Sequence, residues 1–123
     1  MMRYTLRDIR GLRPEIETEL GKVGVTSLPR LAALAQDDER RRAIARETGL
    51  NPAQLRRFVG MSEILSLAGI TPRHAKALFD AGVDSYEKLR TERQEHLFTI
   101  LGKVDPATPD MLRYWIQNGP NAV

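Results

Sequence analysis

Apolar residues recur along this chain at helical spacing, in short stretches that glycine and proline separate. Between Ile64 and Leu89, the apolar residues Ala75, Leu78 and Phe79 fall on one face of a helix. Gly82 follows at the position where helices often end in a left-handed residue. The pattern predicts a succession of short amphipathic helices and an all-α fold.

Nearly the same stretch occurs earlier in the chain, from Leu6 to Leu31. Aligning Gly69 with Gly11 sets an offset of 58 residues, because 69 − 11 = 58, and further residues then match. The matched pairs are Pro14 and Pro72, Leu20 and Leu78, Gly24 and Gly82, Val25 and Val83, Ser27 and Ser85, and Leu31 and Leu89. Such a repeat predicts two pseudo-symmetric units that pack together as one compact domain.

The repeat also predicts where the units begin and end. We expect a first unit at residues 1–60, a second at 61–117 and a flexible C-terminal tail at 118–123. A helix begins after Asn51, and its counterpart opens at Thr108 and Pro109 after a loop at 105–108. Gly60 is a poor helix former, so the helix after Asn51 is expected either to kink there or to end before Ser62.

Residues that cap helix N-termini precede the predicted helices. Thr71 is the expected cap of the helix that Pro72 opens. Asp84, with Glu87 three residues later, resembles a capping box for the helix through Leu89. These caps place the helix starts independently of the apolar pattern.

The stretch around Gly69 resembles the helix-hairpin-helix motif, in which a Gly-apolar-Gly hairpin joins an apolar helix to a second helix. More widely, residues 47–116 resemble a bacterial domain family of unknown function that carries such hairpins in tandem. The match rests on Gly49, Leu55, Val59, Leu67–Ile70, Ala75, Leu78, Ala81–Ser85, Leu89, Pro109, Trp115 and Ile116. The resemblance implies an all-helical fold and a nucleic-acid role, without an established activity.

Composition excludes several classes of protein. The 123 residues are 41% hydrophobic and 28% charged, as in ordinary globular domains, and no apolar run is long enough to span a membrane. The first residues lack the apolar stretch of a secretory signal, so a cytoplasmic location is expected. With no Cys and two His, neither a metal site nor another cofactor is expected.

In the motif that this chain resembles, backbone N–H groups at a helix N-terminus contact phosphate oxygens without reading bases. Here Gly69 turns the second hairpin, and Thr71 offers a hydroxyl group. Arg73 and Lys76 lie on the first turns of the following helix, where a phosphate would bind. Most of the basic residues are Arg, whose planar guanidinium suits phosphate, and the formal net charge is +3.

The other candidate phosphate contacts are less favourable. Arg13 lies in the first hairpin, but the helix after it begins with acidic residues that repel phosphate, among them Glu15. Arg13 and Thr71 also stand where the motif has its second hairpin glycine. Arg42 and Arg46 share one helix face at a spacing of four residues and form a further candidate patch.

Two functions remain open on these grounds. The first is non-catalytic, sequence-independent binding to a nucleic-acid backbone, DNA rather than RNA, through the second hairpin. The alternative is a module for protein interaction or self-association in which the hairpins are purely structural. No catalytic motif is present, His74 lacks a partner at a meaningful spacing, and Trp115 matches Phe58 as a core residue. An enzyme is therefore not expected.

Overall fold

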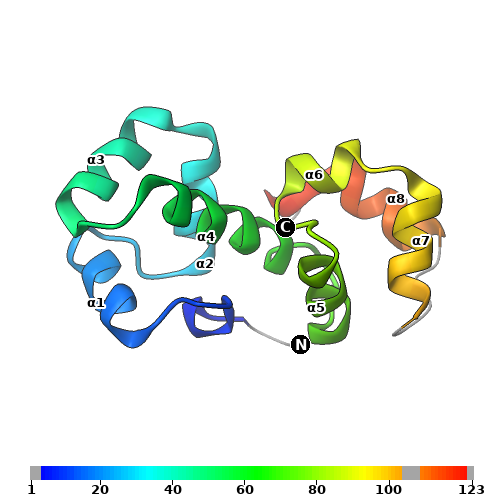
Figure 1. The fold of residues 1–123 in the computed structure, drawn as a ribbon. Helices are drawn as coiled ribbons and strands as arrows, with labels where there is room; N and C mark the ends of the chain where they lie inside the picture. Colours follow the sequence, from blue (N-terminus) through cyan, green and yellow to red (C-terminus); the bar gives the residue numbers. More distant parts are fainter. Residues whose placement is uncertain (1–3, 104–108, 122–123) are drawn as a thin grey trace.

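The computed structural model describes residues 4–103 and 109–121, and every regular element in these ranges is a helix. The predicted all-α fold is confirmed. The elements are η1 (Leu6–Asp8), α1 (Pro14–Lys22), α2 (Leu28–Ala32), η2 (Ala33–Gln36), α3 (Asp38–Thr48), α4 (Pro52–Leu65), α5 (Pro72–Asp80), α6 (Tyr86–Thr91), α7 (Gln94–Gly102), α8 (Pro109–Asn118) and η3 (Gly119–Asn121) (Figure 1). The predicted loop at 105–108, with the expected cap Thr108, lies outside the described residues.

Short polar side chains cap several helices at their N-termini. The hydroxyl of Thr71 accepts a hydrogen bond from the His74 N–H at 3.1 Å, and α5 begins directly after it. Before α6 the cap is Ser85, whose hydroxyl accepts from the Lys88 N–H at 3.1 Å. The prediction of Asp84 as this cap is wrong by one residue, because the Asp84 carboxylate pairs with the Lys88 ammonium instead, at 2.7 Å.

Helices α1 and α5 end in the same way, 58 residues apart. After α1, the Val25 N–H donates to the Leu20 carbonyl at 2.9 Å, and the corresponding bond after α5 measures 2.8 Å. Gly24 and Gly82 precede these donors in the left-handed conformation, with φ of +86° and +85°. Together these features form the Schellman motif, which favours glycine because a side chain is strained at that φ.

The turns before α1 and α5 also correspond. The Leu12 N–H donates to the Ile9 carbonyl at 3.2 Å, and the equivalent bond before α5 measures 3.3 Å. Gly11 and Gly69 stand at the same place in the two turns, with φ of +87° and +76°. Both glycines lie between helices, so the chain turns a corner at each, as the sequence predicts.

Helix α4 is the central element of the fold. It contacts α2, α3 and η2 on one side and α5, α6 and η3 on the other (Figure 1). Phe58 and Ile64 are among its fully buried residues. The helix continues through Gly60 and Ser62 to Leu65, so it does not end before Ser62. The predicted boundary between residues 60 and 61 therefore lies inside a continuous helix.

The N-terminal segment lies against the region around α5. The Tyr4 hydroxyl donates to the Ile70 carbonyl at 2.6 Å, which ties the start of the chain to the second turn. Arg10, beside the first turn, pairs with Asp80 at the end of α5 at 2.9 Å. The two glycine turns therefore approach the same helix from its opposite ends.

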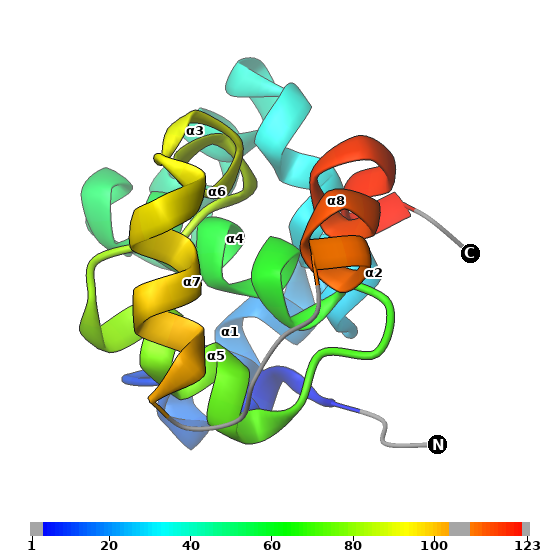
Figure 2. The same cartoon turned by 90° about the vertical axis from the view of Figure 1, so that its right-hand side faces the viewer.

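Helices α7 and α8 lie on the face that Figure 2 turns toward the viewer. Trp115 of α8 is buried, and its indole N–H donates to the Ala68 carbonyl at 2.7 Å. The His74 ring meets it edge-on, with ring centroids 5.7 Å apart. Trp115 is thus a core residue, as predicted. The segment predicted as a tail starts at Asn118, the last residue of α8, and continues as η3.

Candidate functional site

The second hairpin, which joins α4 to α5, lies at the protein surface. Gly69 is exposed, and a Cβ built on it would meet no atom within 4 Å. The next residue, Ile70, is buried. The hairpin backbone is therefore open to a ligand at Gly69, while its apolar neighbour holds it in the core.

The first turn of α5 adds positive charge beside this hairpin. Thr71 uses its hydroxyl oxygen to cap the helix, through the bond from the His74 N–H. Arg73, the second residue of α5, is exposed and forms no ion pair with another described residue. The nine-residue helix contributes the partial positive charge of its N-terminus. Arg73 therefore carries an uncompensated charge at the positive end of a helix.

Lys76 is less available than Arg73, because it is ion-paired. Its ammonium lies 2.8 Å from Asp80, whose other carboxylate oxygen lies 2.9 Å from Arg10. Hydrogen bonds from Lys76 and then Arg10 lower the pKa of Asp80 below its ordinary value. Two cations thus share one carboxylate. The sequence pattern missed Arg10, because its partner lies 70 residues further along the chain.

The first hairpin keeps the acidic surroundings that the sequence indicates. Arg13 directly precedes α1, is exposed and makes no capping bond with its side chain. Glu15 is exposed on the first turn, and Glu17 pairs with Arg7 at 3.3 Å. A phosphate at this hairpin would therefore meet at least one uncompensated carboxylate.

Arg42 and Arg46 are exposed on α3. Helix α3 lies on the opposite side of α4 from α5 (Figure 1). The structure therefore does not bring these two arginines together with Arg73. The predicted binding residues fall into three separate places, namely the two hairpins and α3.

A groove of about 850 Å³ lies between η2, the start of α3, α4 and the start of α6. Its basic residues are Arg41, Arg42, Arg56, Arg57 and Lys88. Its acidic residues are Asp38, Glu63, Asp84 and Glu87. Of the predicted binding residues, Arg42 alone lines this groove. The others escaped notice because they come from separate elements that only the folded chain assembles.

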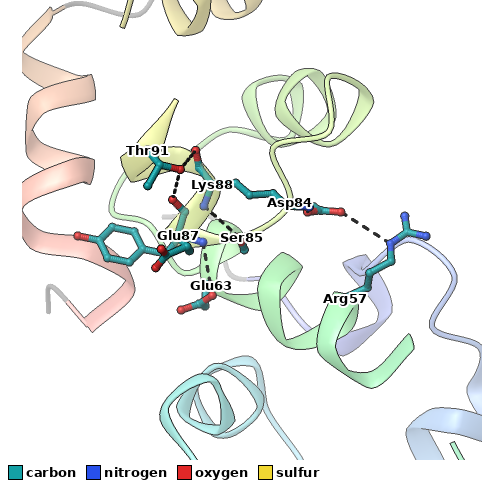
Figure 3. Close-up of polar contacts among 8 residues, drawn as sticks. Arg57, Glu63, Asp84, Ser85, Glu87, Lys88 and Thr91 are labelled. Atoms are coloured by element: carbon teal, nitrogen blue, oxygen red, sulfur yellow. Dashed lines mark hydrogen bonds and ion pairs between the residues drawn. The ribbon is translucent and has the colours of Figure 1, made fainter. Parts of the chain in front are cut away.

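Asp84 is the fixed negative centre at one end of the groove (Figure 3). Its carboxylate lies 2.7 Å from the Lys88 ammonium and 3.7 Å from Nε of Arg57. The Asp84 side chain is 15% exposed, whereas that of Arg57 is 67% exposed. Asp84 is therefore held in place, while the Arg57 guanidinium extends into solvent.

Glu63 lies in the wall of the groove that α4 forms. Its side chain is buried, and one carboxylate oxygen accepts a hydrogen bond from the Tyr86 N–H at 3.4 Å (Figure 3). Burial raises the pKa of Glu63 above its ordinary value of 4.5, and the charge of Glu87 raises it further. The Tyr86 bond and the charge of Arg41 oppose that shift.

His74, the one histidine that attracted attention in the sequence, is buried in the core beside Trp115. Across residues 4–103 and 109–121, no three His, Cys, Asp or Glu side chains gather so that they could hold a metal ion. Within the same ranges, no helix has the length and apolar character that crossing a bilayer requires.

The fold and surface define an all-α domain whose glycine turns are exposed beside arginine side chains. The chain matches the family model described as Domain of unknown function (DUF4332) over residues 10–113, and it belongs to that family. The resemblance to a domain family of unknown function is thereby confirmed. No curated protein and no solved structure is significantly similar to the chain.

Proposed function

We propose that this protein binds the phosphate backbone of nucleic acid, DNA rather than RNA, without reading base sequence. The proposal rests on Arg73, an exposed and unpaired cation at the positive end of α5, next to the open backbone at Gly69. Phosphate oxygens bind well where a helix N-terminus and an arginine converge. In this proposal the chain acts as a cytoplasmic binding module without catalytic activity.

We further infer that the chain consists of two helix-hairpin-helix repeats. The matching turn bonds at Leu12 and Ile70 support this inference, as do the matching helix ends at Val25 and Val83. The glycines that turn the two hairpins have similar positive φ values. A duplication accounts for these agreements at one common offset.

The two hairpins differ in charge at one equivalent position. Glu15 and Arg73 are both exposed and are both the second residue of their helices. A carboxylate there repels phosphate, and a guanidinium attracts it. The second hairpin is therefore the principal contact, with Lys76 and Arg13 contributing less and the Arg42 and Arg46 pair forming a separate, weaker one.

Titration of a generic DNA duplex at increasing salt tests this function. Binding should weaken steeply with salt, because phosphate contacts release counterions. Arg73→Glu should weaken binding by about tenfold at low salt and reduce the salt slope by about 1. The substituted Glu at the second helix position favours the positive helix end, so the variant should fold normally.

The equivalent position in the first hairpin supplies the reciprocal test, because Glu15→Arg should strengthen duplex binding. Arg93→Glu is the matched control, since this arginine is exposed and precedes α7. Absence of duplex binding at low salt would refute the proposed function. An equal loss of affinity in Arg73→Glu and Arg93→Glu would refute the assignment to the second hairpin.

The alternative function, a module for protein interaction or self-association, is favoured by one observation at the same hairpin. Thr71 stands in place of the second hairpin glycine, and its hydroxyl oxygen already caps α5. In this alternative the hairpins serve only to turn the chain. The duplex titration separates the two functions, because a purely structural hairpin gives no difference between wild type and Arg73→Glu.

A further inference from the structure

The groove between α3, α4 and α6 carries positive charge that its own carboxylates do not neutralise. Arg42 on α3 and Arg56 on α4 are both exposed, and neither forms an ion pair with another described residue. They belong to different helices that border the same hollow. A ligand lying in the groove would therefore meet an unpaired guanidinium from each of two helices.

The Asp84 end of the groove adds a third available cation. Arg57 and Lys88 share the Asp84 carboxylate, so these three residues together keep one net positive charge. Lys88 holds the shorter contact, at 2.7 Å, while Arg57 is 3.7 Å away and largely exposed. Because exposed ion pairs contribute little, Arg57 can exchange Asp84 for a ligand carboxylate at small cost.

The groove does not suit a nucleic-acid strand equally well. The carboxylates of Glu63 and Glu87 line it, and they would repel a ligand that carries a negative charge on every nucleotide. Pro52 and Ala53 are exposed, and they give one wall an apolar part. A peptide can place acidic side chains at the arginines and apolar or neutral side chains elsewhere.

We propose that this groove binds an acidic segment of a partner protein, whose Asp and Glu side chains pair with Arg42, Arg56 and Arg57. Guanidinium groups bind carboxylates through two parallel hydrogen bonds, which fix the geometry of the pair. Charge complementarity accelerates association and weakens with salt. This surface is separate from the second hairpin, so the proposal does not depend on nucleic-acid binding.

A labelled peptide in which Glu alternates with Ala is the probe, and the same peptide with Gln in place of Glu is its control. Fluorescence anisotropy at low salt should detect binding of the Glu peptide and at least about tenfold weaker binding of the Gln peptide. The double variant Arg42→Ala, Arg56→Ala should weaken binding of the Glu peptide by about tenfold or more.

Arg40→Ala is the matched control, because Arg40 is exposed on the same helix α3 and does not line the groove. It should leave affinity for the Glu peptide within about twofold of wild type. Amide shifts in a nitrogen-15 NMR spectrum should localise the peptide to α3, α4 and the start of α6. Thermal melting of each variant verifies that it is folded.

Several results would overturn the proposal. These are no binding of the Glu peptide at low salt, equal losses in the Arg40 and groove variants, or amide shifts away from the groove. Tighter binding of a single-stranded oligonucleotide than of the peptide at the same groove amides would assign the groove to nucleic acid instead. Arg73→Glu should leave peptide binding unchanged, so failure here is distinguishable from failure at the hairpin.

Discussion

Gly60 in α4 packs directly against the backbone carbonyl of Asp84, in the segment between α5 and α6. A Cβ built on Gly60 would stand 2.3 Å from the Asp84 oxygen and 3.0 Å from the Ser85 Cβ. No side chain fits in this contact without movement of the backbone. The glycine is therefore required by tertiary packing, although it lies inside a helix where it lowers local helix propensity.

Gly60→Ala should destabilise the protein by about 3 kcal/mol, because the new methyl group forces α4 and the Asp84 segment apart. Gly21→Ala is the matched control, since Gly21 also lies inside a helix but has no atom within 4 Å of an added Cβ. The control should gain about 0.5–1 kcal/mol from improved helix propensity. Chemical denaturation of both variants measures the difference, and equal effects would contradict the packing role.

Glu63→Gln should stabilise the protein at neutral pH and have less effect in acid. The folded-state pKa of Glu63 is raised by burial, so its stability contribution is present below 4.5 and is lost as pH rises through the folded pKa. Gln keeps an acceptor for the Tyr86 N–H without the buried charge.

Urea unfolding at about pH 4 and about pH 8 tests this sign, because the advantage of Gln should grow with pH. The pKa of Asp80 is shifted in the opposite direction by its cations, and that contribution is common to both proteins and cancels in the comparison. An advantage of Gln that is the same at both pH values would show that the Glu63 charge is not the cause.

Trp115→Phe should cost about 2 kcal/mol, because it removes the donor to the Ala68 carbonyl and leaves space in the core. The neighbouring Tyr114→Phe is the control, since Tyr114 is 48% exposed. That change should stay within about 0.5 kcal/mol of wild type. Thermal or chemical unfolding gives both values, and similar losses would argue against Trp115 as an anchor of α8.

Asp80→Asn should strengthen duplex DNA binding by about threefold at low salt. The change removes the carboxylate that neutralises Lys76 and Arg10 near the second hairpin. Glu92→Gln changes the net charge equally, but its partner is His96 on α7. A larger gain for Asp80→Asn than for Glu92→Gln supports binding near α5, and equal gains would indicate a dependence on net charge alone.

The sequence was informative wherever the structural cause is local. Helix ends at Gly24 and Gly82 follow from the positive φ that glycine tolerates, and the cap at Thr71 follows from its place before a proline. The same residue types recur in the second copy, so a single reading of the pattern located both turns. The burial of Trp115 followed from its match with the apolar Phe58.

What escaped prediction depends on partners distant along the chain. Gly60 looked like a weak point in a helix, because the carbonyl it accommodates belongs to Asp84, 24 residues later. Arg10 gave no signal until folding placed it beside Asp80. The cationic groove likewise combines residues of three helices, and no single stretch of sequence contains its pattern.

The single helix α4 has a consequence for how the protein would have to be divided. Its N-terminal half packs with α2 and α3, and its C-terminal half leads into the second hairpin. Cleaving the chain between residues 60 and 61 would cut this helix and leave each fragment with a bare apolar surface. Co-expressed fragments should therefore reassociate to recover native structure, and neither should be well folded in isolation.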